Sequence, residues 1–328
     1  LSRQTYYFVL LALFIFSAFR FEIGCDWIGY KNAFAHTIGV HWTELLFSRE
    51  VLFWIIIKLM QSINLPYPYI NIISSAIFFI GIHILAKRQP DPLSFLIILF
   101  PILIINMPMS GIRQGAAIGI FCIALVAFID RRPIKFLFWI IIATGIHTSA
   151  IIFILLLPFA TGRFNNTRLA MIALLVFPCV IFFYFLDTVQ LAIEIYVGSG
   201  REAYGAAFRV IFLALSGCYF LLCVKKKWQQ NSPKDYSIVS IGSIAMILLA
   251  FLTPISTIIV DRFGYYLIPI QAMIFARIPY LPFKLNHSLH SILPYIGLLV
   301  IFFVWTQTSW MFKLCYVPYN SWIFGLPK

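Results

Sequence analysis

The sequence predicts an all-α, polytopic transmembrane helix bundle, and three features of it carry that prediction. The 328 residues are 62% hydrophobic and only 11% charged, whereas soluble proteins carry about a quarter charged residues. Apolar runs of membrane-spanning length recur from end to end. The cations lie between those runs, as the positive-inside rule predicts, so the net charge of +13 does not point to nucleic acid. We expect one integral-membrane domain over residues 1–328.

The apolar runs predict about 11 spans, each set by the length of its run. In chain order the spans are 5–19, 67–86, 92–109, 112–129, 134–146, 148–160, 168–186, 207–224, 236–256, 263–278 and 289–308. No small-residue cleavage site follows the first run, so we expect a retained helix there. The runs 134–146 and 148–160 are short for two crossings and long for one. Since Gly145 and His147 lie at the break, we interpret them as a tight hairpin of two tilted or incomplete spans.

One further apolar run, Val51–Ile63, is short and carries Lys58. It is typical of a helix lying in the plane of the outer interface, among irregular outer loops. With the N-terminus inside, the inner loops then hold 14 cations and three acids, against ten cations and eight acids outside. The bias is lost if Val51–Ile63 spans the membrane or if 134–160 is a single helix. The charge pattern therefore favours an odd number of spans with the C-terminus outside.

The six cysteines show no CxxC spacing, and Cys122, Cys179, Cys218 and Cys223 lie in apolar runs, where cysteine acts as a small hydrophobic residue. Cys25 and Cys315 are expected on the same side, but spacing alone does not favour a disulfide between them. There is no phosphate-binding lysine loop, no GxSxG, no HExxH and no close His/Cys cluster. We therefore expect neither a metal nor a cofactor.

Arg113 is the most informative single residue. It begins the span 112–129 among Gly111, Gly115 and other small residues, which let neighbouring helices approach closely. We therefore expect it to point into a polar cavity, the alternative being a side chain that extends to the interface. Its guanidinium fork suits phosphate oxygens. If Arg20 and Arg262 converge with it, the three form a diphosphate site; the alternative is that they pair locally with Glu22 and Asp261.

Three residues are candidates for a general base. Asp26 and Glu50 lie in the outer segment 20–66, and a carboxylate can take a hydroxyl proton within hydrogen-bond reach. His147 lies at the tip of the predicted hairpin, where a polar group is costly unless it has a function. The alternatives are solvated surface carboxylates and a histidine that is only a hydrogen-bonding residue. Asp26 or Glu50 is the first choice and His147 the second, and the sequence does not decide among the three.

An ordered set of short motifs resembles the EpsG/Wzy group of bacterial polysaccharide polymerases over nearly the whole chain. The motifs are RFEIGCDWIGY (20–30), REVLFW (49–54), SGIRQGAA (110–117), IHTSA (146–150), DRFGYY (261–266) and CYVPYN (315–320). The chain departs from the common pattern of the group at Cys25, where Thr is frequent, and at Ile146, where Phe is frequent. Neither departure removes an ionisable group.

The resemblance implies a glycosyltransferase in the bacterial inner membrane with a periplasmic active face. It would transfer a glycan from one undecaprenyl-diphosphate carrier to the sugar of a second carrier-linked repeat unit, as in O-antigen and lipopolysaccharide biosynthesis. Membrane lipids and a chain-length regulator are the further partners implied. The matching positions are Arg20, Asp26, Tyr30, Glu50, Arg113, Gln114, His147 and Arg262. Tyr30, Gln114, Tyr266 and Tyr319 are expected to contact the substrate.

Three other functions remain open from the sequence, one of them a membrane acyltransferase using His147, which would need an acyl-donor site. An O-antigen-ligase-like transferase would use the same carrier and the same arginine and histidine chemistry. A carrier-lipid flippase or transporter without catalysis would show internal repeats and charges near the middle of spans. The charged residues of this chain favour the ends of the spans.

Overall fold

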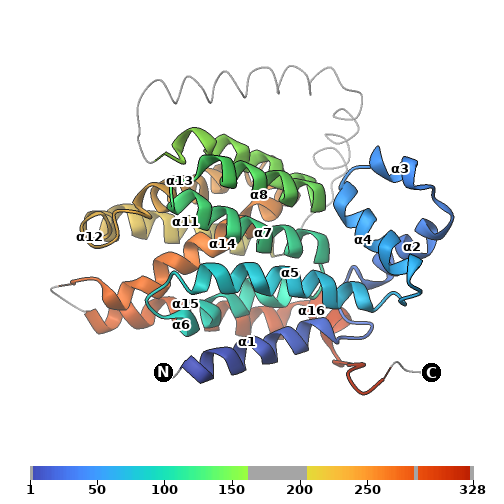
Figure 1. The fold of residues 1–328 in the computed structure, drawn as a ribbon. Coiled ribbons are helices and arrows are strands. Elements are labelled where there is room, and N and C mark those ends of the chain that lie inside the picture. The colour runs from blue at the N-terminus through green and yellow to red at the C-terminus, as the bar shows by residue number, and fades with distance from the viewer. Residues whose placement is uncertain (1–2, 162–204, 284–286, 326–328) are drawn as a thin grey trace.

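The computed structural model describes residues 3–161, 205–283 and 287–325. Within these ranges the chain is helical, with no β-strand and one isolated bridge between Arg20 and Ser321. Most of the longer helices run side by side in an elongated bundle, and α2 (Trp27–His36), α3 (Trp42–Leu46) and α4 (Val51–Ser62) group at one end of it (Figure 1). The predicted all-α helix bundle is confirmed.

The other α-helices follow the order of the predicted spans. They are α1 (Arg3–Ala18), α5 (Tyr69–Ala86), α6 (Pro92–Leu99), α7 (Ile112–Ile129), α8 (Pro133–Ile146), α11 (Ala206–Tyr219), α12 (Lys225–Asn231), α13 (Tyr236–Leu252), α14 (Thr257–Arg277), α15 (His287–Thr308) and α16 (Trp310–Tyr316). The 3₁₀ segments are η1 (Thr37–Gly39), η3 (Thr148–Phe159) and η6 (Ile278–Tyr280), and the π-helical turns are η2 (Phe100–Ile104) and η5 (Phe220–Val224).

Helical segments occupy every predicted span except 168–186, which lies outside the described residues. Some of them are long and apolar enough to cross a membrane unaided. Five such stretches occur among the described residues: Tyr69–Ala86, Ile112–Ile129, Ala206–Asn231, Thr257–Tyr280 and His287–Thr308. The other apolar helices are shorter, 10–17 residues. The protein is thus a multi-pass helix bundle, and the number of eleven crossings stays a prediction.

The start of α14 differs from the predicted span, which began at 263. The helix begins at Thr257, and the Ser256 hydroxyl caps it by accepting a hydrogen bond from the Ile259 backbone N–H at 3.3 Å. Asp261 and Arg262 therefore lie inside the helix rather than before it. The apolar pattern placed the start too late because these two charged residues face a polar cavity and not lipid.

The predicted break at His147 is confirmed, since α8 ends at Ile146 and η3 begins at Thr148. The second arm of the hairpin is a 3₁₀ helix rather than an α-helix, and it contains Pro158. Proline lacks a backbone N–H and disfavours a regular α-helix at this position. His147 itself has extended backbone dihedrals, φ −150° and ψ 119°, so the chain turns sharply at this residue.

The expected outer helix is α4, which follows Glu50 and packs on η1 and α8. Lys58 ties α4 to the preceding segment, since its ammonium donates to the carbonyls of Thr37 and Ile38 at 3.1 and 3.0 Å. The segment 20–66 is more regular than predicted, because it also contains α2, η1 and α3.

Among the described helices long enough to cross a membrane, α7 is the most buried, with 89% of its residues inside the protein. It crosses α5 where Gly81 and Gly119 meet. A Cβ atom placed on either glycine would overlap backbone atoms of the other helix, so the close approach needs small residues at both positions. Arg113 and Gln114 lie in the first turn of α7 and are therefore held by the core of the bundle.

The C-terminal segment packs against the loop that follows α1. Cys25 and Cys315 form a disulfide with Cα atoms 5.0 Å apart across a sequence separation of 290 residues. The expectation from spacing that they do not pair was wrong, because spacing carries no information on contacts made by the fold as a whole. Two backbone bonds support the contact: Gly24 N–H donates to Cys315 O at 2.8 Å, and Phe21 N–H donates to Asn320 O at 2.9 Å.

Other charged residues gather at the opposite end of the bundle, where α12 lies (Figure 1). Arg88 pairs with Asp130 at 2.8 Å, and Arg277 pairs with Asp235. The Arg277 guanidinium also lies 5.1 Å from the ring centroid of Trp228 on α12. All four ionised residues were predicted on the cytoplasmic side, so the two predicted faces correspond to the two ends of the bundle.

Candidate functional site

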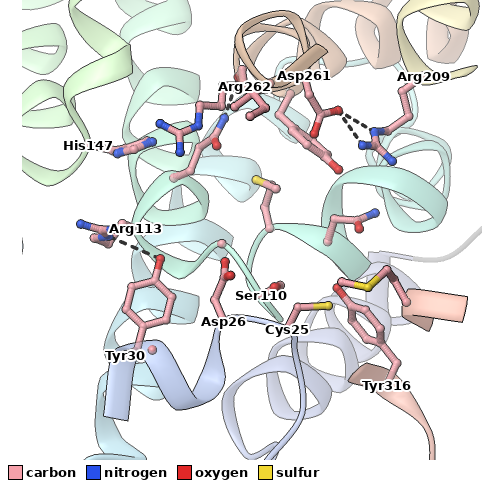
Figure 2. A pocket seen from close by; sticks show the side chains of 18 of the residues that line it. Cys25, Asp26, Tyr30, Ser110, Arg113, His147, Arg209, Asp261, Arg262 and Tyr316 are labelled. Atoms are coloured by element: carbon pink, nitrogen blue, oxygen red, sulfur yellow. Dashed lines mark hydrogen bonds and ion pairs between the residues drawn. The ribbon is translucent and has the colours of Figure 1, made fainter. Parts of the chain in front are cut away.

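A polar cavity of about 810 Å³ opens at the end of the bundle near α2 and α4. Its walls come from α2, α4, α7, α11, α14, α15, α16 and the segment before α7 (Figure 2). Six of the residues predicted as site residues line it: Asp26, Tyr30, Arg113, Gln114, His147 and Arg262. Helices far apart in the sequence thus bring most of the predicted residues to one place.

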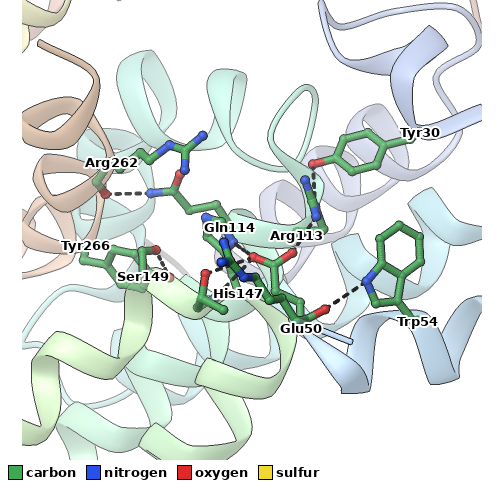
Figure 3. A network of polar contacts seen from close by, with 11 residues as sticks. Tyr30, Glu50, Trp54, Arg113, Gln114, His147, Ser149, Arg262 and Tyr266 are labelled. Atoms are coloured by element: carbon green, nitrogen blue, oxygen red, sulfur yellow. Dashed lines mark hydrogen bonds and ion pairs between the residues drawn. The ribbon is translucent and has the colours of Figure 1, made fainter. Parts of the chain in front are cut away.

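Glu50 lies behind this wall and connects three parts of the chain (Figure 3). It precedes α4 in the left-handed region, φ 62°, and its side chain is 7% exposed. Arg113 Nη1 donates to Glu50 Oε2 at 2.5 Å, and His147 Nδ1 contacts Oε1. The Thr148 backbone N–H also donates to Oε1, at 3.2 Å. A non-glycine residue rarely adopts this backbone region, and these bonds offset its cost.

The charge state of Glu50 follows from these contacts. Burial raises the pKa of the Glu50 carboxyl, but the hydrogen bond with His147, the charge of Arg113 and the backbone N–H of Thr148 outweigh it. The pKa falls from 4.5 to about 2. Glu50 is therefore ionised near neutral pH and is a weak base. As an anion it holds Arg113 and His147 in place.

His147 is held from two sides. Its backbone N–H donates to the Ala143 carbonyl at 2.8 Å at the end of α8, and its Nδ1 meets Glu50. The residue is buried but lines the cavity. Because Nδ1 is engaged by the carboxylate, Nε2 is the ring nitrogen left for a group in the cavity. A carboxylate that holds Nδ1–H leaves Nε2 as the proton acceptor.

Arg113 crosses the space between α7 and α2. Its Nε lies 3.4 Å from the Tyr30 hydroxyl, and its guanidinium carbon lies 5.3 Å from the centre of the Tyr30 ring. The side chain keeps 33% of its surface exposed. Since Glu50 uses one N–H of Nη1 and Tyr30 the N–H of Nε, both N–H groups of Nη2 are left for the cavity. Arg113 is thus paired with Glu50 on one side of its guanidinium, and it lines the pocket on the other side.

Gln114 links α7 to α14. Its amide nitrogen donates to the Arg262 backbone carbonyl at 2.6 Å. Both residues line the cavity, on the same side as His147 (Figure 3). Arg262 does not pair with its neighbour Asp261, so the local ion pair considered from the sequence does not form.

Asp26 lines the opposite wall, directly before α2 and next to the Cys25 disulfide (Figure 2). It does not cap α2 with its side chain. No donor among the described residues reaches its exposed carboxylate. Asp26 therefore remains a second candidate base, of a different kind from His147, which has an orienting partner.

Arg20 does not line the cavity, so the expected convergence of three guanidiniums does not occur. The residue is 2% exposed. Its guanidinium donates to the carbonyls of Ser17 and Ile23 at 2.7 and 3.1 Å and to Asn71 Oδ1 at 2.8 Å. These acceptors hold the turn after α1, and Arg20 is a structural residue that pairs neither with Glu22 nor with a carboxylate.

Two tyrosines predicted to contact substrate also lie outside the cavity lining. Tyr266 is fully buried, and the Ser149 hydroxyl donates to its oxygen at 3.2 Å. Tyr319 is exposed, donates to the Phe16 carbonyl at 2.6 Å and stacks on the Phe16 ring at 4.9 Å. The sequence motif contained both, but their rings pack against protein.

The cavity wall also contains an ion pair that was not predicted from the sequence. Arg209 Nη2 and Nε lie 2.7 and 2.8 Å from Asp261 Oδ1, and both residues line the cavity. Arg209 lies in the first turn of an apolar helix, as Arg113 does. The same signal of a charge at a span start would have found it.

No group of three or more His, Cys, Asp or Glu side chains suited to a metal ion occurs in the described part of the chain. The fold and the cavity define a multi-pass membrane protein with a charged, polar pocket at one end of its bundle. The EpsG family model matches residues 4–321, and the chain belongs to the EpsG family. It is therefore a polysaccharide-polymerase-like membrane protein of the glycosyltransferase type. No curated protein and no solved structure matches it.

Proposed function

We propose that the protein is a polysaccharide polymerase of the bacterial inner membrane. It transfers a glycan from one undecaprenyl-diphosphate carrier to the sugar of a second carrier-linked repeat unit. The observation that carries this proposal is the Glu50 network, which holds a histidine and an arginine side by side at the wall of one cavity. Membership of the EpsG family supports the reaction class.

In this proposal His147 is the general base and Glu50 is its positioning residue. The Nε2 atom of His147 takes the proton from the acceptor hydroxyl, while the carboxylate of Glu50 stabilises the imidazolium that forms. Glu50 suits this role because its low pKa keeps it ionised. Asp26, across the cavity, is the alternative base.

Arg113 and Arg262 bind the diphosphate of the donor. The acceptor oxygen forms a bond to the anomeric carbon, and the bond from that carbon to the phosphate oxygen breaks with its electron pair on the diphosphate. The leaving group thus gains negative charge, which nearby guanidinium donors stabilise in a partly desolvated cavity. Direct attack inverts the configuration at the anomeric carbon. Arg20 takes no part, since protein acceptors engage each of its three nitrogens.

Two observations support a periplasmic orientation of the cavity. The Cys25–Cys315 disulfide lies beside it, and disulfides persist in oxidising compartments such as the periplasm. The excess of cations predicted for the cytoplasmic side includes those at the opposite end of the bundle.

The test is complementation of a strain that lacks the protein, with His147→Gln, Arg113→Lys and Arg113→Ala. We expect each variant to leave single repeat units on the cell surface in place of long chains. Lys31→Ala, on the exposed side of α2, is the control and keeps the normal chain length. Immunoblotting of membranes verifies that each variant is present.

The phenotype separates the rival functions. A ligase-type transferase predicts that the variants attach no glycan at all, and a flippase predicts that the lipid-linked unit accumulates on the cytoplasmic face. Normal long chains in all three variants would refute the proposed roles of His147 and Arg113.

A further inference from the structure

The Arg209–Asp261 pair lies in the cavity wall apart from the Glu50 network. In the view of Figure 2, Arg262 lies between this pair and His147. The two side chains are only 13% and 17% exposed, so the pair is largely desolvated. Two nitrogens of Arg209, Nε and Nη2, meet the same oxygen, Oδ1. No donor among the described residues reaches the other carboxylate oxygen, Oδ2.

Three aromatic side chains accompany the pair in the cavity lining: Tyr265, Trp305 and Tyr316. The Arg209 guanidinium carbon lies 5.3 Å from the Tyr265 ring centroid. The Trp305 and Tyr316 rings are 5.7 Å apart and nearly perpendicular, at 72°. The disulfide at Cys315 secures the segment that carries Tyr316. The cavity lining therefore combines a fixed carboxylate with rigid aromatic surfaces.

The chemistry of this wall differs from that of the arginine side. An ionised carboxylate accepts hydrogen bonds only, and it repels a phosphate. A sugar offers what the wall lacks: hydroxyl donors for Asp261 and an apolar C–H face for an aromatic ring. The aromatic rings also lose little conformational freedom on binding, since they are already packed.

We infer that Asp261, positioned by Arg209 beside Tyr265 and sharing the cavity with Trp305 and Tyr316, forms a saccharide-binding subsite for the repeat unit. It is separate from the arginines that hold the diphosphate. This inference rests on the proposed function and adds a specificity-determining element to it: Asp261 Oδ2 accepts from sugar hydroxyls, and Trp305 packs on the sugar ring.

The alternative role of the pair is purely structural. A buried ion pair can be replaced by apolar residues of similar volume with little loss of stability, whereas removal of one partner is costly. The double variant Arg209→Met with Asp261→Leu therefore keeps the packing and removes the carboxylate. Asp261→Asn removes the charge alone.

The test measures binding to purified full-length protein in nanodiscs with two probes. One is undecaprenyl diphosphate without sugar, and the other is the lipid-linked oligosaccharide extracted from cells that lack the protein. We expect wild type to bind the oligosaccharide more tightly. Asp261→Asn and the double variant should each weaken that binding by about tenfold or more, the loss expected for a hydrogen bond to a charged group. Their affinity for bare undecaprenyl diphosphate should remain at the wild-type level.

The other outcomes overturn the inference. Equal weakening for both probes means that the pair is structural, and unchanged binding of both means that no sugar contacts it. Arg113→Ala is the reference, since it should weaken both probes. Wild-type protein that binds neither probe refutes the proposed function itself, and the inference with it. If the Asp261 variants yield little folded protein, Trp305→Ala is measured with the same two probes. It should weaken the binding of the oligosaccharide and leave the binding of bare undecaprenyl diphosphate unchanged.

Discussion

Glu50→Gln is the sharpest perturbation of the site, because it conserves shape and removes one charge. The carboxylate accepts from Arg113 Nη1 through one oxygen and from Thr148 N–H and His147 through the other. A glutamine amide has one oxygen and one NH₂ group, so it cannot accept on both sides. If the oxygen stays with Arg113, the NH₂ group faces His147 and turns Nδ1 into an acceptor. Nε2 then carries the proton and can no longer act as the proposed base.

The expected losses of rate and of stability in Glu50→Gln follow from these contacts. Loss of a general base lowers the rate by about 10²–10⁴-fold, which raises the barrier by about 3–5 kcal/mol. The free energy of unfolding falls by less than the barrier rises. Breaking a buried ion pair costs about 3–5 kcal/mol, and the 33% exposure of Arg113 reduces this toward about 2 kcal/mol. The variant should therefore fold and fail in catalysis.

The assay is the initial rate of glycan extension in nanodiscs with purified lipid-linked repeat units, together with the thermal unfolding midpoint. Glu44→Gln is the matched control, since Glu44 is exposed on α3 and does not line the cavity. It should match wild type in both measurements. A Glu50→Gln rate equal to wild type, with unfolding intact, would show that Glu50 does not orient the base.

Three further outcomes are expected. Cys25→Ser should lower the thermal stability by about 2–5 kcal/mol, while Cys223→Ser, at an exposed free thiol, should leave it unchanged. Gly119→Leu should abolish accumulation of folded protein in membranes, since a side chain there overlaps the α5 backbone; normal accumulation contradicts the close crossing. The stabilising effect of Glu50 is present above pH 4.5 and is lost as the pH falls toward about 2. The stability difference between wild type and Glu50→Gln should accordingly shrink between pH 7 and pH 3, and a constant difference refutes the low pKa.

The position of each residue along the long axis of the bundle was predictable from the sequence. Apolar runs place residues along the membrane normal, and α7 spans the predicted residues, Ile112–Ile129. The charge bias assigned each span end to one of two faces. That was enough to bring Asp26, Glu50 and His147 to the same end of the molecule. It was not enough to show that Glu50 is the partner of His147, because contacts between distant segments leave no periodic signal.

The sequence did not show in which direction around the helix axis a side chain points. Two arginines illustrate the reason. Successive residues of a helix point about 100° apart, so depth alone does not say which neighbour a side chain meets. Arg113 was predictable because Ala116 and Ala117 follow it at helical spacing, with Gly115 and Gly119 close to them in the sequence, and mark the face that packs on other helices. Arg20 lies beyond the end of α1 at Ala18, so its small neighbours do not mark a helix face, and it turns inward to Asn71 instead of the cavity. A charge at a span end thus predicts a site residue only where small neighbours also show the direction in which it points.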